Sequence, residues 1–387
     1  MLANQKKEIL QLFASALQAV GAPSDAKIVL ERPKQTAHGD VACTVALQCA
    51  KAMKMPPRAI AEQIVAKLNE NPQTKELISA IQIAGPGFIN MTLSEAAKQA
   101  VVPLILKEGA AYGCSDEHTG QSVLLEYVSA NPTGPLHLGH ARQAALGDVL
   151  SRMLKSQGWS VTREFYYNDA GVQIHNLAIS VQARAKELLG ENVVFPEDGY
   201  HGLYIVDIAK DYLAKKDIQT FDGGVITSSG NPDDLEDIRT YSVAYLRNEQ
   251  HRDLEALDVS FDNYYLESSL YKDGRVEKAV QAIKDAGKTY EKDGALWFKS
   301  TDYGDDKDRV MRKADGTYTY FIPDVAYHLA KFERGHSRAI NIQGTDHFGT
   351  IARVRAGIQA ASGAYGYTIP KDFPEYMLHT MLQLVKD

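Results

Sequence analysis

The sequence predicts an α/β protein built on a doubly wound parallel sheet, with a large connective insertion and a small α+β domain in front of it. The first observation is a strand–helix–strand pattern between Val123 and Tyr167, which is typical of a βαβ unit. The second is that loops rich in Gly, Asn and Asp follow the apolar strands, where parallel sheets carry their ligand sites. The third is a change in charge balance after about residue 110, which separates an N-terminal region from the rest.

The length, composition and net charge of the chain limit the classes of protein to which it can belong. A chain of 387 residues with 44% hydrophobic and 24% charged residues is expected to form two or three domains of an ordinary globular enzyme. The net charge of −7 excludes a generally basic nucleic-acid coat. Cys43, Cys49 and Cys114 form no CxxC pair, so we expect no structural zinc and no disulfide framework. Free thiols and the lack of an 18-residue apolar stretch favour a cytoplasmic protein without membrane contact.

The N-terminal region, residues 1–115, is predicted to be a compact α+β domain. The expected elements are helices at 9–20, 41–53 and 57–68 and strands at 28–30, 81–84 and 88–90. Residues 1–110 contain 12 Lys and Arg against 9 Asp and Glu, whereas the remainder contains 30 against 40. This asymmetry mildly favours RNA contact by the first domain, although a solvated surface without a partner explains the charge equally well.

The most informative stretch joins the strand at 123–128 to the helix that follows. It consists of Ala130, Asn131, Pro132, Thr133, Gly134, Pro135, Leu136, His137, Leu138, Gly139 and His140. A helix start presents free N–H groups and the positive end of the dipole, so it suits phosphate, and the two histidines add donors there. Gly139 would let the backbone approach a nucleotide closely. From the turn alone two other interpretations stay open, a metal held by both histidines and ordinary capping or core histidines.

Two later loops follow predicted strands and are expected at ligand-binding strand ends. The first holds Asn168, Asp169, Gly171 and Gln173, and the second holds Gly344, Asp346 and His347. A plain turn capped by an aspartate is the alternative for the first. Between these loops, residues 190–301 are acidic and tyrosine-rich, which predicts an insertion within a domain that spans 116–387.

A helix after the turn at 315–316 is expected to carry Asp324, with Tyr320 one helical turn earlier facing the same cavity. Glu126 is a polar residue in an apolar strand and is costly to bury unless it meets a cation. Carboxylates around one cavity suit a guanidinium, which donates in a planar fork, better than an ammonium. The alternative is that Asp324 only caps its helix.

The 130–140 stretch, preceded by Glu126 and Tyr127, resembles the HIGH-type signature of class I aminoacyl-tRNA synthetases in its arginyl-tRNA synthetase form. The segments 38–40, 84–90, 168–173, 315–328 and 340–349 are also similar to that family. The resemblance implies a Rossmann-type catalytic domain and an N-terminal domain that contacts the elbow of the tRNA. It implies catalytic roles for His137, Gly139 and His140, arginine binding by Glu126, Asn131, Tyr320 and Asp324, ATP binding by His137, Gly139, His140, Gly344, Asp346 and His347, and a cleft lined by Asn168, Asp169, Gly171 and Gln173.

The implied reaction is arginine–tRNA ligation, in which arginine and ATP give arginyl-adenylate and the arginine is then transferred to tRNA(Arg) for protein synthesis. ATP is then a substrate accompanied by Mg²⁺, with no metal site formed by the protein, and a monomer is expected. The family's second signature, KMSKS-like, and its anticodon-binding domain are not found in the sequence. We therefore expect a chain that covers the N-terminal and catalytic part of such an enzyme and is nearly inactive alone.

Two alternatives belong to other functional classes. One is a nucleotidyltransferase that uses HxGH without tRNA, and the α+β first domain and the Tyr320–Asp324 pair weigh against it. The other is a non-catalytic RNA-binding paralogue, against which the intact His137, Gly139 and His140 weigh.

Overall fold

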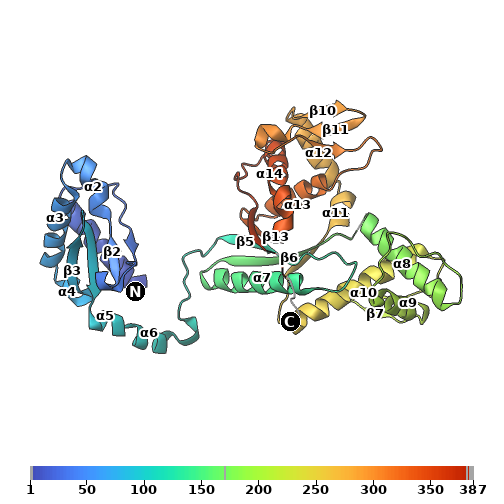
Figure 1. The fold of residues 1–387 in the computed structure, drawn as a ribbon, viewed down its shortest axis with the longest axis horizontal. Coiled ribbons are helices and arrows are strands. Elements are labelled where there is room, and N and C mark those ends of the chain that lie inside the picture. The colour runs from blue at the N-terminus through green and yellow to red at the C-terminus, as the bar shows by residue number, and fades with distance from the viewer. Residues whose placement is uncertain (1–2, 170, 381, 383–387) are drawn as a thin grey trace. The chain divides into compact units, whose positions relative to one another are not determined.

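A computed structural model of the chain describes residues 3–169, 171–380 and 382 (Figure 1). The chain divides into two compact units, Met1–Gly113 and Cys114–Asp387. Each unit has its own hydrophobic core. Ala170, within the first predicted ligand loop, lies outside the described residues.

The first unit is a four-stranded antiparallel sheet, in the order β1-β2-β4-β3, covered by helices. Its strands are β1 Leu30–Glu31, β2 Val41–Cys43, β3 Ile78–Ala84 and β4 Phe88–Leu93. Its helices are α1 Ala3–Ala19, α2 Val45–Met53, α3 Pro57–Glu70, α4 Pro72–Leu77, α5 Glu95–Gln99 and α6 Val101–Glu108, with 3-10 turns η1 Thr36–His38 and η2 Gly109–Ala111. The α+β prediction for this region is confirmed by these elements.

The expectation of a helix beginning at residue 41 is wrong, because β2 occupies residues 41–43 and α2 begins only at Val45. Asp40 fixes this strand from one end. Its backbone N–H donates to the carbonyl of Met91 at 2.8 Å, and its carboxylate accepts the N–H of Leu93 at 2.9 Å. Both partners lie on β4, so the residues after Asp40 are held in register with that strand.

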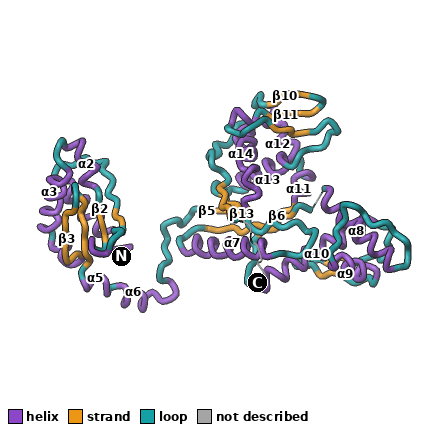
Figure 2. Tube along the Cα trace, viewed as in Figure 1, coloured by secondary structure: helices purple, strands orange, loops and turns teal. Residues whose placement is uncertain are grey.

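The second unit is built on a five-stranded parallel sheet in the order β14-β13-β5-β6-β9 (Figure 2). Its strands are β5 Ser122–Glu126, β6 Ser160–Tyr167, β9 Asn263–Leu266, β13 Ala339–Gly344 and β14 Glu375–His379. The βαβ unit predicted from the sequence is β5, α7 Leu138–Ser156 and β6. Because all five strands run the same way, their carboxyl ends meet at one edge of the sheet.

Helices cover both faces of this sheet, as Figure 1 shows. Val123 and Leu125 of β5 pack in one core with Ala144 of α7, whereas Leu124 packs in another core with Val325. Val325 belongs to α13 Phe321–Glu333, which packs against α14 Phe348–Ser362. Alternate residues of one strand therefore enter opposite layers, and the predicted doubly wound α/β fold is confirmed.

The chain leaves the sheet twice between its strands. The first excursion, here called the insertion lobe (172–256), lies between β6 and β9. It comprises α8 Val172–Leu188, α9 Leu203–Leu213, β7 Ile218–Gln219, β8 Val225–Ile226 and α10 Leu235–Ala256. The second, between β9 and β13, comprises α11 Glu267–Lys272, α12 Arg275–Asp285, β10 Thr289–Lys292, β11 Ala295–Phe298, η3 Ser300–Tyr303, β12 Arg309–Arg312 and α13. The single insertion expected at 190–301 thus contains β9, a strand of the sheet.

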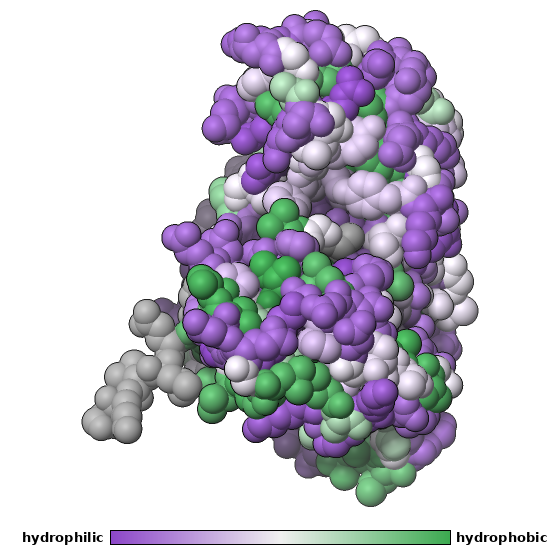
Figure 3. Space-filling view, turned by 90° about the vertical axis from the view of Figure 1, so that its right-hand side faces the viewer, coloured by the Kyte–Doolittle hydropathy of each residue, from purple (hydrophilic) through white to green (hydrophobic). Residues whose placement is uncertain are grey.

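The surface is mixed in character. The face in Figure 3 is largely hydrophilic, with hydrophobic side chains in separate patches. Among the described residues, none of the helices combines the length and the apolar character that a membrane span needs.

Candidate active site

The chain bends sharply where β5 ends. Val128 and Ser129 have φ of 68° and 41°, a region that a β-branched residue such as valine rarely adopts. Side chains hold this backbone, because Gln143 accepts the N–H of Val128 at 3.1 Å and the Ser129 hydroxyl accepts the N–H of Tyr166 at 3.2 Å. Strain of this kind persists only when the surroundings impose it, and it is common at ligand sites.

The bend leads into the predicted HxGH turn, where His137 is the N-cap of α7. Its Nδ1 accepts the N–H of Gly139 at 3.1 Å, and Nδ1 of His140 accepts the N–H of His137 at 3.2 Å. The two histidines form a reciprocal capping box. The capping interpretation is therefore confirmed, but it uses only one nitrogen of each ring.

The other nitrogens remain available as donors. Since each Nδ1 accepts a backbone N–H, a neutral ring carries its proton on Nε2. Burial, and then the neighbouring His137, lower the pKa of His140 to about 4, so this ring is neutral at pH 7. The rings stack with centroids 3.7 Å apart. A Cβ on Gly139 would lie 2.9 Å from the ring of His137, so glycine here makes room for the stacked histidine.

A cavity of about 320 Å³ opens at the carboxyl ends of β5, β6 and β13. Asn131 lines it, whereas His137, Gly139 and His140 are not among the residues of its wall. Of the predicted site residues, six line it: Glu126, Asn131, Asn168, Tyr320, Asp324 and His347. Gln173 does not line the cavity. Its side-chain oxygen accepts a hydrogen bond from the side-chain amide of Asn131 at 2.6 Å. The turn after β5 and the start of α8 are thereby joined at the site.

Asp169 lies elsewhere. Its carboxylate accepts the backbone N–H of Ser268 at 2.9 Å and the hydroxyl of the same residue at 2.6 Å, at the start of α11. Gly171 is the N-cap of α8 with φ of 85°. These two residues shape the loop and do not line the cavity.

Glu126 already has a cationic partner within the protein. Its carboxylate accepts a hydrogen bond from Lys331 of α13, whose side chain is wholly buried, and a second from the Ser129 hydroxyl at 3.2 Å. Lys331 also donates to the side-chain oxygen of Asn341 at 2.9 Å. The cation that the sequence demanded beside Glu126 is therefore a lysine of this chain.

Two other carboxylates in the cavity have no such cation among their described hydrogen bonds. Burial, followed by the charges of Glu267 and Glu126, raises the pKa of Asp324 to about 7. Burial is also the main cause that raises the pKa of Glu267, which accepts a hydrogen bond from the hydroxyl of Tyr166 at 2.7 Å. The N-cap position of α13 is Tyr320 and carries no side-chain cap bond, so nothing supports the capping interpretation of Asp324. The cavity is electrostatically suited to a cation.

The second predicted loop lies at the end of β13. Gly344 precedes the 3-10 turn η4 Thr345–His347, where a Cβ on Gly344 would meet the Asp346 carboxylate at 2.2 Å. Asp346 pairs with Nε2 of His347 at 3.4 Å, and both side chains are exposed. This loop stands at the same sheet edge as the HxGH turn.

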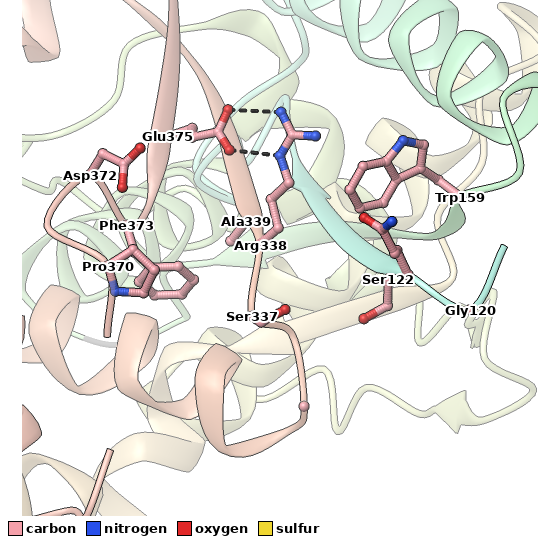
Figure 4. Close-up of a pocket in the computed structure, with 12 residues that line it drawn as sticks. Gly120, Ser122, Trp159, Ser337, Arg338, Ala339, Pro370, Asp372, Phe373 and Glu375 are labelled. Carbon is pink, nitrogen blue, oxygen red and sulfur yellow. Dashed lines mark hydrogen bonds and ion pairs between the residues drawn. The ribbon is translucent and has the colours of Figure 1, made fainter. Parts of the chain in front are cut away.

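A second cavity, of about 580 Å³, lies at the opposite edge of the sheet, where β5, β6, β13 and β14 begin (Figure 4). The charges of Arg338 and Glu375 in its wall neutralise each other, because these two side chains form two hydrogen bonds of 2.7 and 3.0 Å. Arg338 also lies 5.0 Å from the ring centre of Trp159. The candidate chemistry is therefore at the carboxyl edge and not here.

Comparison with known proteins agrees with this geometry. The family described as "tRNA synthetases class I (R), catalytic domain" matches residues 101–346, and the one described as "Arginyl tRNA synthetase N terminal domain" matches residues 7–93. The chain belongs to the arginyl-tRNA synthetase family.

Individual members of the arginyl-tRNA synthetase family are similar over the whole chain. An arginine–tRNA ligase of Burkholderia ambifaria is 57% identical over 387 residues, which cover 100% of this chain and 64% of that protein. One from Herminiimonas arsenicoxydans is 55% identical over 389 residues and is covered to 67%. The arginyl-tRNA synthetase structure from Thermus thermophilus has a TM-score of 0.66 at 20% identity, covering 97% of this chain and 65% of that one, and shows a shared fold. The chain thus spans 64% of the length of the first of these relatives.

Sequence reasoning missed two residues that define the site of this family member. Glu267 follows β9 directly, and an acidic residue at a strand's carboxyl end is the same signal that pointed to Asp346. Lys331 gave no comparable signal, because a lysine on an amphipathic helix is expected at the surface.

Proposed function

We propose that this protein is part of an arginine–tRNA ligase, which activates arginine with ATP to arginyl-adenylate and transfers it to tRNA(Arg). The observation that carries the proposal is the pair of carboxylates, Asp324 and Glu267, which have raised pKa values and line one cavity together with Asn131. An arginine side chain in this cavity would supply the missing positive charge. The curated relatives that match the whole of this chain are named arginine–tRNA ligases, which supports the same reaction.

The geometry favours arginine over lysine. A guanidinium donates in a planar fork and can serve two carboxylates and a phenol, whereas an ammonium would leave acceptors unpaired. Asp324 and Glu267 supply the carboxylates, and the mostly exposed Tyr320 lies at the mouth of the cavity. Asn131 and Glu126 are assigned to the same arginine site, with Glu126 acting while it is held by Lys331.

The activation step needs positioning and charge stabilisation more than covalent help from the protein. A carboxylate oxygen of arginine attacks the α-phosphorus of ATP, and the bond to pyrophosphate breaks. Nε2–H groups of His137 and His140, with Gly139 between them, would donate to the phosphate oxygens as charge builds on them. Gly344, Asp346 and His347 are assigned to the ribose and base side of ATP, and Asn168, Asp169, Gly171 and Gln173 to the shape of the cleft.

Mg²⁺ would arrive with the nucleotide. Among the described residues no group of three His, Cys, Asp or Glu side chains lies close enough to hold a metal ion. In this proposal Mg²⁺ belongs to the nucleotide substrate, and this chain supplies the groups that bind and orient arginine and ATP. We also assign tRNA contact to the N-terminal unit and propose a cytoplasmic monomer.

The test is arginine-dependent exchange of pyrophosphate into ATP by the protein that carries this chain, with tRNA(Arg) present. Arginine should support exchange, while lysine and citrulline, the uncharged analogue of arginine, should support far less. Exchange that is equal with citrulline would contradict the carboxylate pair. Exchange that needs a small acceptor other than an amino acid would favour the nucleotidyltransferase alternative.

A further inference from the structure

The HxGH turn is held in place by side chains that come from the insertion lobe. Gln250 of α10 donates through Nε2 to the carbonyl of Asn131 at 3.0 Å and to that of Gly134 at 2.9 Å. Tyr204 of α9 donates its hydroxyl to the carbonyl of Thr133 at 2.8 Å. Three backbone carbonyls of one four-residue turn are thus bound by two residues of one lobe.

Both described side-chain hydrogen bonds of Gln250 go to this turn. Its side chain is wholly buried, and its Oε1 has no hydrogen-bond partner among the described residues. Both contacts are to carbonyl oxygens, which accept only, so the amide must present its NH₂ to the turn. A buried glutamine with one half unsatisfied is costly, and its two bonds to the turn offset that cost.

The hold extends to the histidines. Gly134 lies three residues before His137, and Pro135 restricts the backbone between them. A Cβ on Gly134 would lie 3.3 Å from the Tyr204 hydroxyl, so the turn and the lobe are already in close contact. Residues 131–137 belong to no helix or strand of their own, and a shift of Gly134 would therefore move the N-cap of α7.

We propose that Gln250 and Tyr204 are positioning residues that set where the Nε2–H donors of His137 and His140 lie, through their hydrogen bonds to residues 131–134. The predicted change in reaction rate rests on the proposed function. The predicted change in the local order of residues 131–140 does not. Neither residue lines the cavity, so neither is assigned contact with substrate. The insertion lobe therefore has a structural role in activation besides any contact of its own.

The lobe offers a matched control for each residue. Gln182 of α8 donates its amide to the carbonyl of Pro232 at 2.8 Å, a bond that stays within the lobe. The hydroxyl of Tyr212 of α9 lies 2.9 Å from the carbonyl of Asn231 and 2.8 Å from the carboxylate of Asp237, and both acceptors belong to the lobe. Gln182→Met and Tyr212→Phe remove the same chemical groups as Gln250→Met and Tyr204→Phe without touching the turn.

The first measurement is amide hydrogen exchange of residues 131–140 in the 387-residue chain, with no ligand needed. Gln250→Met and Tyr204→Phe should speed exchange of this segment, while Gln182→Met and Tyr212→Phe should leave it unchanged. Equal protection in all four variants would overturn the positioning role, whatever the reaction of the protein is.

The second measurement is steady-state and calorimetric, on the protein that carries this chain. Gln250→Met should lower kcat for arginine-dependent pyrophosphate exchange by about 10-fold to 100-fold, as expected when a reacting geometry is displaced. The Kd of arginine should change less than about threefold, because Gln250 binds only the backbone carbonyl of Asn131 within the arginine site, and Asp324 and Glu267 lie on other elements. A loss that appears equally in Gln182→Met would overturn the inference. If the unsubstituted protein showed no arginine-dependent pyrophosphate exchange, the proposed function would be contradicted instead. The amide hydrogen-exchange measurement would still decide whether Gln250 and Tyr204 position the turn.

Discussion

Lys331 and Glu126 form an ion pair inside the catalytic unit, with the lysine side chain 0% and the carboxylate side chain 8% exposed. Burial lowers the pKa of Lys331, while the charges of Glu126 and Glu164 oppose that change. The side-chain oxygen of Asn341, the residue beside Glu126 in the neighbouring strand, accepts a second hydrogen bond from the lysine. Glu126 lines the cavity, and its pairing with Lys331 leaves Asp324 and Glu267 as the lining carboxylates without an ion pair among the described residues.

Lys331→Met should destabilise the protein strongly, because it leaves Glu126 buried and unpaired. Removing one member of a buried pair costs about 3–5 kcal/mol of unfolding free energy. Lys288→Met is the control, since Lys288 pairs with Asp302 at the surface at 2.8 Å and a solvent-exposed pair contributes little to stability. Denaturant unfolding of both variants measures the difference. Equal losses would show that the buried pair is not stabilising Glu126.

Asp324→Asn should weaken arginine binding by about 2–5 kcal/mol, as when a buried charge loses its partner. The stability of the fold should not decrease, because burial and the nearby charges of Glu267 and Glu126 disfavour the ionised form of Asp324. Calorimetric titration of arginine beside a melting curve checks both parts. Unchanged affinity with a lowered melting temperature would contradict the arginine site and restore a structural role for Asp324.

The pH dependence of arginine binding follows from the same group. With a pKa of about 7 in the free protein, Asp324 must lose a proton before it can pair with a guanidinium. Affinity should therefore fall about tenfold for each pH unit below 7 and level off above it. Calorimetry in two buffers of different ionisation enthalpy should show about one proton released per arginine near pH 6 and few near pH 8.

The raised pKa of Asp324 affects arginine affinity and protein stability in opposite directions as the pH rises. The folded state keeps a proton on Asp324 between its ordinary pKa of 3.8 and about 7, where the unfolded chain has lost it. The contribution of Asp324 to stability without ligand therefore falls as pH rises through that window. Asp324→Asn should remove this contribution and the proton release, while Asp302→Asn, at the surface, should keep both. Proton release that persists in Asp324→Asn would assign it to Glu267 instead.

Much of the fold could be predicted because its signals are local. The βαβ unit showed as an apolar run, a helical repeat from Leu146 to Leu154 and an alternating strand, and Gly158 marked the helix end. The strand at 41–43 could not be predicted in the same way, since it depends on Asp40 bonding to β4, which lies about fifty residues later. Apolar residues in so short a run fit a helix or a strand equally well until their partner is known.

The site was predictable in part for a related reason. Strand ends and the turn at His137 are recognisable from the chain alone, and Tyr320 and Asp324 do line one cavity. The partner of Glu126 was not, because Lys331 lies 205 residues away and its burial is set by the packing of α13. The three hydrogen bonds from the insertion lobe to residues 131–134 are likewise set by tertiary packing, and glutamine carries no pattern that announces such a role.

Gly147→Ala should destabilise α7 although alanine favours helices. A Cβ there would lie 2.2 Å from the ring of Tyr127, which is itself wholly buried. Overpacking of this kind costs about 1–3 kcal/mol. Gly349→Ala in α14 is the control, because nothing lies within 4 Å of its added Cβ, and it should stabilise by about 0.5–1 kcal/mol. Thermal unfolding of the two variants should shift in opposite directions, and a stabilised Gly147→Ala would contradict the packing between α7 and β5.

The last prediction separates the two roles that the structure gives His137. As N-cap it accepts the N–H of Gly139 through Nδ1, and as a phosphate donor it would use Nε2. Asparagine is a good N-cap but lacks the distant ring nitrogen, whereas alanine lacks both. Melting curves should therefore show a loss of about 1 kcal/mol for His137→Ala and little for His137→Asn.

Both variants should nevertheless slow adenylate formation alike, by about 10²–10³ when one transition-state donor is lost. His140→Ala should behave as His137→Ala does, because its Nδ1 completes the capping box. Arginine affinity should stay near that of the unsubstituted protein in all three, since the carboxylates of Asp324 and Glu267 are untouched. Single-turnover rates measure this directly: if His137→Asn activates arginine at the normal rate, the ring acts only as a cap, and the phosphate role passes to the backbone N–H groups at the start of α7.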